Sequence, residues 1–225
     1  RRVEKMAILG EMAAGLAHEI KNPLASLAGA IQMLENDLDL KADQSRLMRI
    51  VLRETERLTD LLNRYLLFSK PQAGKIANIH LGREVEETVE MIKKNSRFKE
   101  NTVFDRNISG DIFIQMDPGH LRQILWNLFL NAAESKQDNC RVLIHSGEVR
   151  NKRVKVRIKD NGNGISPEAM GAIFDPFFTT KPHGTGLGLS IVHRILQSYN
   201  GQVAVESRPD QGTVFTIDLP AKSTP

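Results

Sequence analysis

The hydrophobic residues of this chain change their spacing near residue 70, and that change divides the chain into two kinds of structure. Before it, apolar residues recur every three or four positions, which is the period of one helix face. This spacing predicts one continuous helix over residues 3–37, a short polar link over 36–43 and a second helix over 44–68. The apolar positions of the first helix are Leu9, Met12, Ala13, Leu16, Ile20, Leu24, Leu27, Ile31 and Leu34.

Two helices joined by a short link form an antiparallel hairpin. A hairpin with one broad apolar face per helix cannot bury those faces by itself. We therefore expect two copies of the chain to pair through a four-helix bundle, as a homodimer. Packing of the hairpin against the rest of its own chain is the alternative interpretation.

Residues 70–75, Lys-Pro-Gln-Ala-Gly-Lys, break the helical period and mark the expected boundary between a first domain of residues 1–72 and a second of residues 73–225. Beyond the boundary, alternating apolar and polar residues predict strands between helices, which makes the fold class α+β. The predicted helices cover residues 81–94, 117–135 and 187–199, and the predicted strands cover 102–107, 112–116, 141–148, 153–159, 202–207 and 213–219. Residues 160–186 are predicted to be rich in loops.

Composition excludes several classes of function. The formal charge is +4, but basic residues are interleaved with acidic ones, so no direct nucleic-acid partner is expected. Cys140 is the single cysteine, which excludes an intramolecular disulfide and a thiolate metal cluster. No apolar run approaches the roughly 20 residues that span a bilayer. Because the sequence lacks an initiator methionine, we expect it to begin within a longer protein, and any membrane attachment to come from a missing upstream region.

A polar cluster, His-Glu-Ile-Lys-Asn-Pro at residues 18–23, lies within the first predicted helix. His18 is two residues beyond an apolar position, about 200° around the helix, so its imidazole is expected to project into water. Glu19 can orient or deprotonate that ring, and Asn22 shares its surface at i+4. Pro23 predicts a kink. For a single residue, an ordinary surface histidine on a bent helix is the more common explanation.

Asn127 and Asn131 are four residues apart within the helix predicted to follow Asp117 and Pro118, so they share a helix face. Asparagine is a poor helix former, and apolar residues surround both positions. An amide oxygen suits magnesium, and amide hydrogens suit phosphate. The alternative is two polar positions on a solvated face.

Two glycine-rich stretches flank an aromatic segment. In the first, residues 160–164, Asp160 ends a strand and could accept a hydrogen bond from an amino group such as that of adenine. The second, residues 184–190, leads into a helix whose free amides favour phosphate, although it matches neither the phosphate loop nor the dinucleotide fingerprint. The aromatic segment, residues 173–181, is typical of an anchored lid. Taken separately, the glycine-rich stretches are also common in turns and flexible loops.

In this order, the segments resemble the sensor histidine kinases of two-component systems across nearly the whole chain. The resemblance matches residues 18–23 to the phospho-acceptor box of that family, and Asn127 with Asn131 to its asparagine box. The remaining matches are the first glycine box at 160–164, the phenylalanine box at 174–178 and the second glycine box at 184–188. The form Asp-Pro-Phe-Phe-Thr-Thr-Lys at residues 175–181 resembles the nitrogen-regulation subgroup.

The resemblance implies that residues 1–72 form the dimerisation and histidine phosphotransfer hairpin. Residues 73–225 would form a catalytic α/β-sandwich domain that binds ATP, of the type shared by gyrase, heat-shock protein 90 and histidine kinases. The implied activity is autophosphorylation of His18 from ATP and Mg²⁺, phosphotransfer to an aspartate of a response-regulator receiver domain, and phosphatase activity toward that partner. The implied location of this fragment is cytoplasmic, while the full-length protein could be anchored in a membrane.

The resemblance also implies a role for each matched residue. His18 would be the nucleophile, Glu19 its base, and Asn22 the residue that positions water for dephosphorylation. Asn131 would hold magnesium and Asn127 would support the phosphates. The remaining residues would contact the nucleotide, Asp160 at the adenine amino group and the others around it: Gly162, Gly164, Thr180, Lys181, Gly184, Thr185, Gly186, Leu187 and Gly188.

Two other classes of function remain as alternatives. One is a nucleotide-binding scaffold without catalysis, and the other is a gyrase-like ATPase that uses nucleotide only as a clamp. The helical hairpin favours the kinase over the clamp, because a clamp does not require a hairpin that displays His18.

Overall fold

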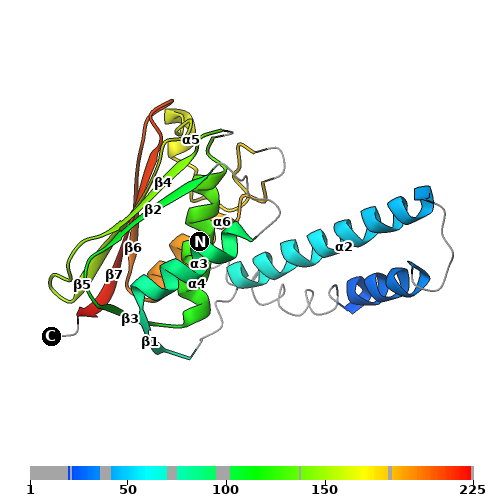
Figure 1. Ribbon diagram of the computed structural model, residues 1–225, viewed down its shortest axis with the longest axis horizontal. Helices are drawn as coiled ribbons and strands as arrows, with labels where there is room; N and C mark the ends of the chain where they lie inside the picture. Colours follow the sequence, from blue (N-terminus) through cyan, green and yellow to red (C-terminus); the bar gives the residue numbers. More distant parts are fainter. Residues whose placement is uncertain are drawn as a thin grey trace, which may run out of the picture. The chain divides into compact units, whose positions relative to one another are not determined.

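We describe the chain from a computed structural model. The structure describes residue 20 and residues 22–35, 42–69, 75–94, 102–136, 138–181 and 184–223. The chain divides into two compact units, Arg1–Gln72 and Ala73–Pro225, which are considered separately here (Figure 1).

The first unit is helical throughout its described residues. Residue 20 and residues 22–35 are helical, and α2 spans Ala42–Ser69. The predicted helix over residues 44–68 is therefore confirmed, with two more residues at its start and one at its end. Of the predicted helix over residues 3–37, the part outside residues 20 and 22–35 lies beyond the described residues.

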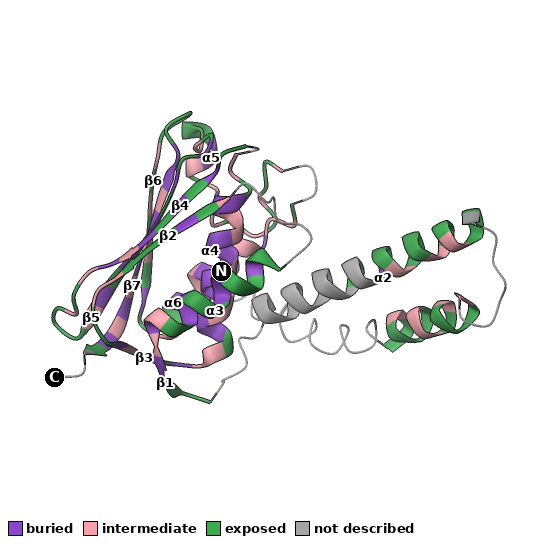
Figure 2. Ribbon diagram, in the orientation of Figure 1, coloured by how far each residue is buried: buried purple, intermediate pink, exposed green. Residues whose placement is uncertain are grey.

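Apolar side chains on α2 remain exposed. Four of them lie within about 100° of one another around the helix: Leu47, Ile50, Val51 and Leu58. Each of these residues has 44–63% of its surface exposed. Leu27 and Leu34 of the preceding helical stretch are also exposed (Figure 2). A contiguous apolar stripe of this kind on a water-facing helix indicates a surface that pairs with another protein surface.

The second unit is a seven-stranded mixed sheet with helices on one face (Figure 1). The strands are β1 Ala77–His80, β2 Val103–Ile108, β3 Ile112–Met116, β4 Arg141–Ser146, β5 Arg153–Asp160, β6 Gln202–Ser207 and β7 Thr213–Ser223. Their order is β1-β3-β7-β5-β4-β2, with β6 paired to β7; β2 and β4 are parallel, and the other pairs are antiparallel. The helices are α3 Leu81–Lys93, α4 Pro118–Ala133, the short α5 Pro167–Met170 and α6 Gly188–Ser198.

The core lies between the sheet and helices α3, α4 and α6 (Figure 2). In strand β5, the alternation of apolar and basic residues determines which side chains enter the core. Val154, Val156 and Ile158 are buried, while the residues between them are exposed: Lys155, Arg157 and Lys159. Helix α4 contributes fully buried side chains at spacings of three and four: Leu121, Ile124, Leu125 and Leu128. Each such leucine or isoleucine contributes roughly 1.5–3 kcal/mol by leaving water. This unit therefore has a complete core of its own.

The helix starts follow the capping rules. Asp117 accepts a hydrogen bond from His120 N at 3.1 Å, and Pro118 occupies the first helical position of α4, as predicted. His80 caps α3 by accepting from Arg83 N at 3.1 Å. Asp117 and His80 thereby satisfy backbone N–H groups in the first turns of α4 and α3.

Three elements depart most from the sequence prediction, whereas the bounds of the others differ from it by no more than two residues. β1 and α5 were not predicted, because each has only four residues and neither shows a measurable period. β7 continues to Ser223, although the prediction ended at Leu219 before a proline. It continues because its partner changes there, from β5 opposite Pro220 to β3 opposite Ala221.

Candidate nucleotide site

Asp160 occupies the end of β5 and is almost fully buried, with 3% of its surface exposed. Its Oδ1 accepts hydrogen bonds from Gly162 N at 2.8 Å and Thr213 N at 3.2 Å. Burial raises the pKa of this carboxyl, and hydrogen bonds from Gly162, Ser135 and Thr213 offset part of that rise. The protein thus holds one buried carboxyl group in a fixed orientation.

The glycines after Asp160 are required by the protein's own packing. A methyl group added at Gly162 would lie 2.0 Å from Ser135 Oγ, so no other residue fits. Gly164 has a φ of +72°, and a methyl group there would lie 2.0 Å from the Arg208 carbonyl oxygen. The family resemblance implies that both glycines contact the nucleotide. In the structure, their closest approaches are to Ser135 and Arg208.

Asn127 and Asn131 have different environments on α4. Asn127 is buried, with 7% of its surface exposed, and its Nδ2 donates to Gln123 O at 2.9 Å. A methyl group added at Gly188 would lie 3.2 Å from Asn127 Oδ1, which places this amide against the start of α6. Asn131 is half-buried, and its Oδ1 accepts a hydrogen bond from Lys181 Nζ at 3.4 Å. A solvated face is therefore the wrong description for Asn127.

Helix α6 begins without a side-chain cap. Its N-cap residue is Leu187, which makes no capping hydrogen bond, whereas α3, α4 and α5 are capped by His80, Asp117 and Ser166. Before it, Gly186 has a φ of +66°, and its carbonyl accepts from Phe177 N at 3.0 Å. An uncapped helix start directs free N–H groups and a positive dipole outward, which favours an anion.

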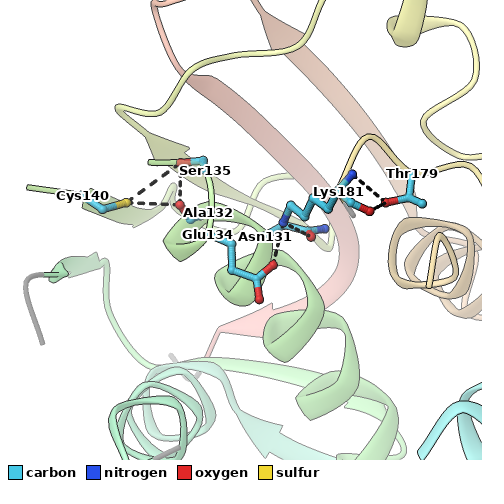
Figure 3. A network of polar contacts seen from close by, with 7 residues as sticks. All are labelled: Asn131, Ala132, Glu134, Ser135, Cys140, Thr179 and Lys181. Carbon is cyan, nitrogen blue, oxygen red and sulfur yellow. Dashed lines mark hydrogen bonds and ion pairs between the residues drawn. The ribbon is translucent and has the colours of Figure 1, made fainter. Parts of the chain in front are cut away.

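Lys181 connects the loop before α6 to the end of α4 (Figure 3). Its Nζ lies 2.7 Å from Glu134 Oε2 and 3.4 Å from Asn131 Oδ1. Its backbone N donates to Thr179 Oγ1 at 3.1 Å, while Thr180 beside it is exposed. Sequence reasoning missed Glu134 and Ser135, although both follow Asn131 within one turn of helix, where contact with the same site is expected.

The aromatic segment before this loop is anchored at one end. Ile173 is buried, and the Phe174 ring lies 5.5 Å from the His193 ring of α6. Phe177 is exposed and has a φ of +67°, which is rare for an aromatic residue. Gly184 N donates to the Lys181 carbonyl at 3.0 Å, and Thr185 Oγ1 accepts from Leu187 N at 3.3 Å.

The predicted residues are brought together only in part. Asp160, the two asparagines and the start of α6 all belong to the second unit. His18 and Glu19 lie outside the described residues, and Asn22 is an exposed residue of the helical stretch 22–35. Within the described ranges, no three histidine, cysteine or acidic side chains gather into a metal site, and no helix is long and apolar enough to cross a membrane.

Two family models match the chain. Residues 8–74 match the His Kinase A (phospho-acceptor) domain, and residues 116–223 match the histidine kinase-, DNA gyrase B- and HSP90-like ATPase family. The first match covers the described helices before and including α2, and the second covers strands β4 to β7 with helices α4, α5 and α6.

Curated relatives are similar along the whole chain. Sporulation kinase E of Bacillus subtilis is 30% identical over 99% of this chain and 30% of its own length. Sensor histidine kinase ZraS of Escherichia coli is 32% identical over the full chain and 48% of its own length. The chain thus spans about a third to a half of the length of these relatives.

Solved structures are also similar to most of this chain. Full-length ShkA in complex with AMPPNP superposes with a TM-score of 0.84 at 28% identity, covering 95% of this chain and 46% of that one. Histidine kinase ThkA in complex with response regulator protein TrrA superposes with a TM-score of 0.67 at 31% identity, covering 98% of this chain and 64% of that one. The catalytic domain of ThkA alone is 32% identical, with a TM-score of 0.58, over 65% of this chain and 95% of that domain.

Proposed function

The chain belongs to the sensor histidine kinases of two-component systems, and on that premise we propose that its second unit binds ATP and phosphorylates His18. The phosphoryl group then passes to an aspartate of a response-regulator receiver domain. The observation that supports this most strongly is the uncapped start of α6 directly beside Asn127. Asn131 lies one turn further along α4, and Lys181 of the loop before α6 donates to it. These groups offer free N–H donors, amide groups and one ammonium to a polyphosphate.

Asp160 is the group proposed to recognise adenine. Gly162 N and Thr213 N both donate to its Oδ1, so the carboxylate is held in place before any ligand arrives. A buried carboxylate accepts a hydrogen bond from an amino group and has no proton to give one, so it favours adenine over a base with a carbonyl at that position. This selection follows from a single side chain whose orientation is already fixed.

The donor set at the end of α4 suits magnesium. Lys181 Nζ already lies between an amide oxygen of Asn131 and a carboxylate oxygen of Glu134, so oxygen atoms face a cation there. Asn131 would hold magnesium, whose charge offsets the charge that develops on the leaving diphosphate. Asn127 and the start of α6 would orient the phosphates, and Thr180, Lys181 and Thr185 lie in the loop that would cover them.

His18 is proposed to act as the nucleophile through its neutral imidazole. One ring nitrogen forms a bond to the terminal phosphorus of ATP, and the bond from that phosphorus to the bridging oxygen breaks, releasing ADP. Glu19, the next residue, would take the proton from the other ring nitrogen or stabilise the positive charge on the ring. In the later step, the phosphoryl group leaves the ring for a carboxylate oxygen of the receiver domain.

The helical unit is proposed to be a homodimer. The exposed stripe of Leu47, Ile50, Val51 and Leu58 on α2 supports this assignment, because pairing two copies of it would remove both from water. Asn22 is exposed on the preceding helical stretch, where a partner domain could reach it. We propose that it positions water in a phosphatase reaction on the response regulator, as the resemblance to the sensor histidine kinases implies.

The kinase function is tested by incubating the purified chain with magnesium and ATP labelled at its terminal phosphate, with His18→Gln as the control. The expected label survives base, is lost in acid and is absent from His18→Gln, because a phosphorus–nitrogen bond is stable in base and labile in acid. ATP binding without any such label would identify a nucleotide-binding scaffold or clamp instead.

A further inference from the structure

Glu134 is an acidic residue at a position where helix stability does not explain it. It is the C-cap residue of α4, where the negative end of the helix dipole opposes a carboxylate. Its carboxylate pairs with Lys181 Nζ at 2.7 Å, across 47 positions of sequence. A contact this distant in sequence, between α4 and the loop before α6, ties the loop to the helix that carries both asparagines (Figure 3).

Lys181 is held at both ends. Its backbone N donates to Thr179 Oγ1, and its carbonyl accepts from Gly184 N. A methyl group added at Gly184 would lie 2.2 Å from Thr179 Oγ1, so Gly184 lies directly against the Thr179 side chain. At the other end, Glu134 and Asn131 accept from the ammonium. The side chain is therefore oriented before nucleotide binds.

The ammonium retains capacity for a further acceptor. A lysine ammonium has three N–H donors, and Glu134 and Asn131 use two of them. Both Lys181 and Glu134 are partly accessible, at 39% and 40% of their side-chain surface, so the third donor can reach a ligand. The charge of Lys181 also acts on buried Asp160, which indicates that Lys181 lies within electrostatic range of the proposed adenine site.

We propose that Glu134 is a positioning residue that holds Lys181 ready to bind the terminal phosphates of ATP. Glu134 acts through Lys181 and does not touch the nucleotide. This role rests on the proposed nucleotide binding by the second unit, and it adds a residue to which neither a motif nor a family match assigns a function.

The proposal predicts opposite effects of one substitution in two backgrounds. In the natural chain, Glu134→Gln loosens Lys181, and the affinity for AMPPNP should fall about threefold, the value of a partly exposed ion pair. Lys181→Met should lower that affinity about tenfold, because a charge-assisted contact to phosphate is lost. In the Lys181→Met background, Glu134 is an unpaired negative charge beside a triphosphate. There, Glu134→Gln should raise the affinity about twofold.

The experiment is titration calorimetry of the full chain and these variants with AMPPNP and magnesium, together with the unfolding midpoint of each variant. The control pair is Glu90 and Lys93 of α3, which are similarly exposed and 3.1 Å apart; Glu90→Gln and Lys93→Met should leave the affinity unchanged. Reversal of the sign of the Glu134→Gln effect between backgrounds, at unchanged unfolding midpoints, supports the positioning role.

An equal effect of Glu134→Gln in both backgrounds would overturn the positioning role and leave the proposed function intact, because the natural chain would still bind AMPPNP. A natural chain that binds no AMPPNP would overturn both. A fall in the unfolding midpoint that parallels the loss of affinity would assign Glu134 a purely structural role and would also overturn the proposal.

Discussion

The two units of this protein differ in where their apolar side chains lie. In the α/β unit, residues such as Leu121, Ile124 and Leu128 are fully buried between α4 and the sheet. In the helical unit, Leu47 has 63% of its surface exposed, and its neighbours on the same stripe are exposed as well. The α/β unit is thus complete as a fold, whereas the helical unit presents a surface that lacks a partner within the described residues. The proposed nucleotide site lies on the complete unit, and the proposed nucleophile lies on the incomplete one.

The largest expected effect separates the binding site from the fold. Asp160→Asn keeps an oxygen that can accept from Gly162 N and Thr213 N, so the α/β unit should remain folded. The new amide would present N–H donors to the adenine amino group, and ATP affinity should fall about 100-fold. Titration calorimetry measures the affinity and circular dichroism the fold. Unchanged affinity in a folded variant would remove Asp160 from the proposed site.

The next effect tests whether an ion pair with a buried carboxylate stabilises the α/β unit. Glu84 is buried on α3, and Arg122 of α4 donates to it at 2.7 Å. Arg122→Met would leave that carboxylate buried without its cation, which should cost about 2–3 kcal/mol in the free energy of unfolding. The single tryptophan, Trp126 on α4, reports this transition by fluorescence.

Arg106→Met is the matched control for Arg122→Met. Arg106 forms an ion pair with Glu86, which is exposed, and its loss should cost less than about 1 kcal/mol. Equal destabilisation by the two substitutions would show that burial of Glu84 does not determine the strength of the α3–α4 contact.

A somewhat smaller effect tests whether the exposed apolar stripe of α2 is a dimer interface. Leu47→Gln removes an apolar side chain from the exposed stripe, and a symmetric dimer contains it twice. At about 1 kcal/mol for each copy, the dissociation constant of the dimer should rise about 30-fold. Arg49→Gln, about 200° away around α2, is the control. Analytical ultracentrifugation measures the dissociation constant of each variant. Equal dissociation constants for the two variants would argue against the four-helix bundle.

The smallest expected effect concerns pH. Burial raises the pKa of Asp160 in the folded state above its usual value near 4. Between those two values, the folded chain binds more protons than the unfolded chain, so the free energy of unfolding should fall as pH rises through that window. Asp160→Asn should lack this contribution to the slope. Urea unfolding of both chains from pH 4 to 7 measures it, and identical slopes would contradict the burial argument.

The sequence predicts most of the fold because its periods are strong where elements are long. β3 and β6 have the predicted bounds, and α2, α3, α4 and α6 lie within a few residues of theirs. β1 and α5 escape prediction because four residues carry too little pattern. β7 is longer than predicted because its partner strand changes at Pro220. Such a change depends on tertiary structure and produces no pattern in the local sequence.

Candidate site residues within a continuous motif can be predicted from the sequence. Contacts between residues far apart in the sequence cannot. Asp160 and Asn131 follow from their motifs, but the pairing of Glu134 with Lys181 joins residues 47 positions apart. The nucleotide contacts expected of the glycines stay predictions. The contact that restricts Gly162 in the structure is with the Ser135 side chain, which only packing reveals. The domain boundary and the roles of His18 and Glu19 stay predictions.

The central claim is that one unit binds nucleotide and the other carries the nucleophile. The most direct test measures ATP affinity and labelling by the terminal phosphate on the same preparations of the natural chain, His18→Gln and Asp160→Asn. The account predicts that His18→Gln binds ATP as the natural chain does and takes no label, while Asp160→Asn loses both. Label that persists in His18→Gln, or ATP affinity that disappears with His18, would contradict it.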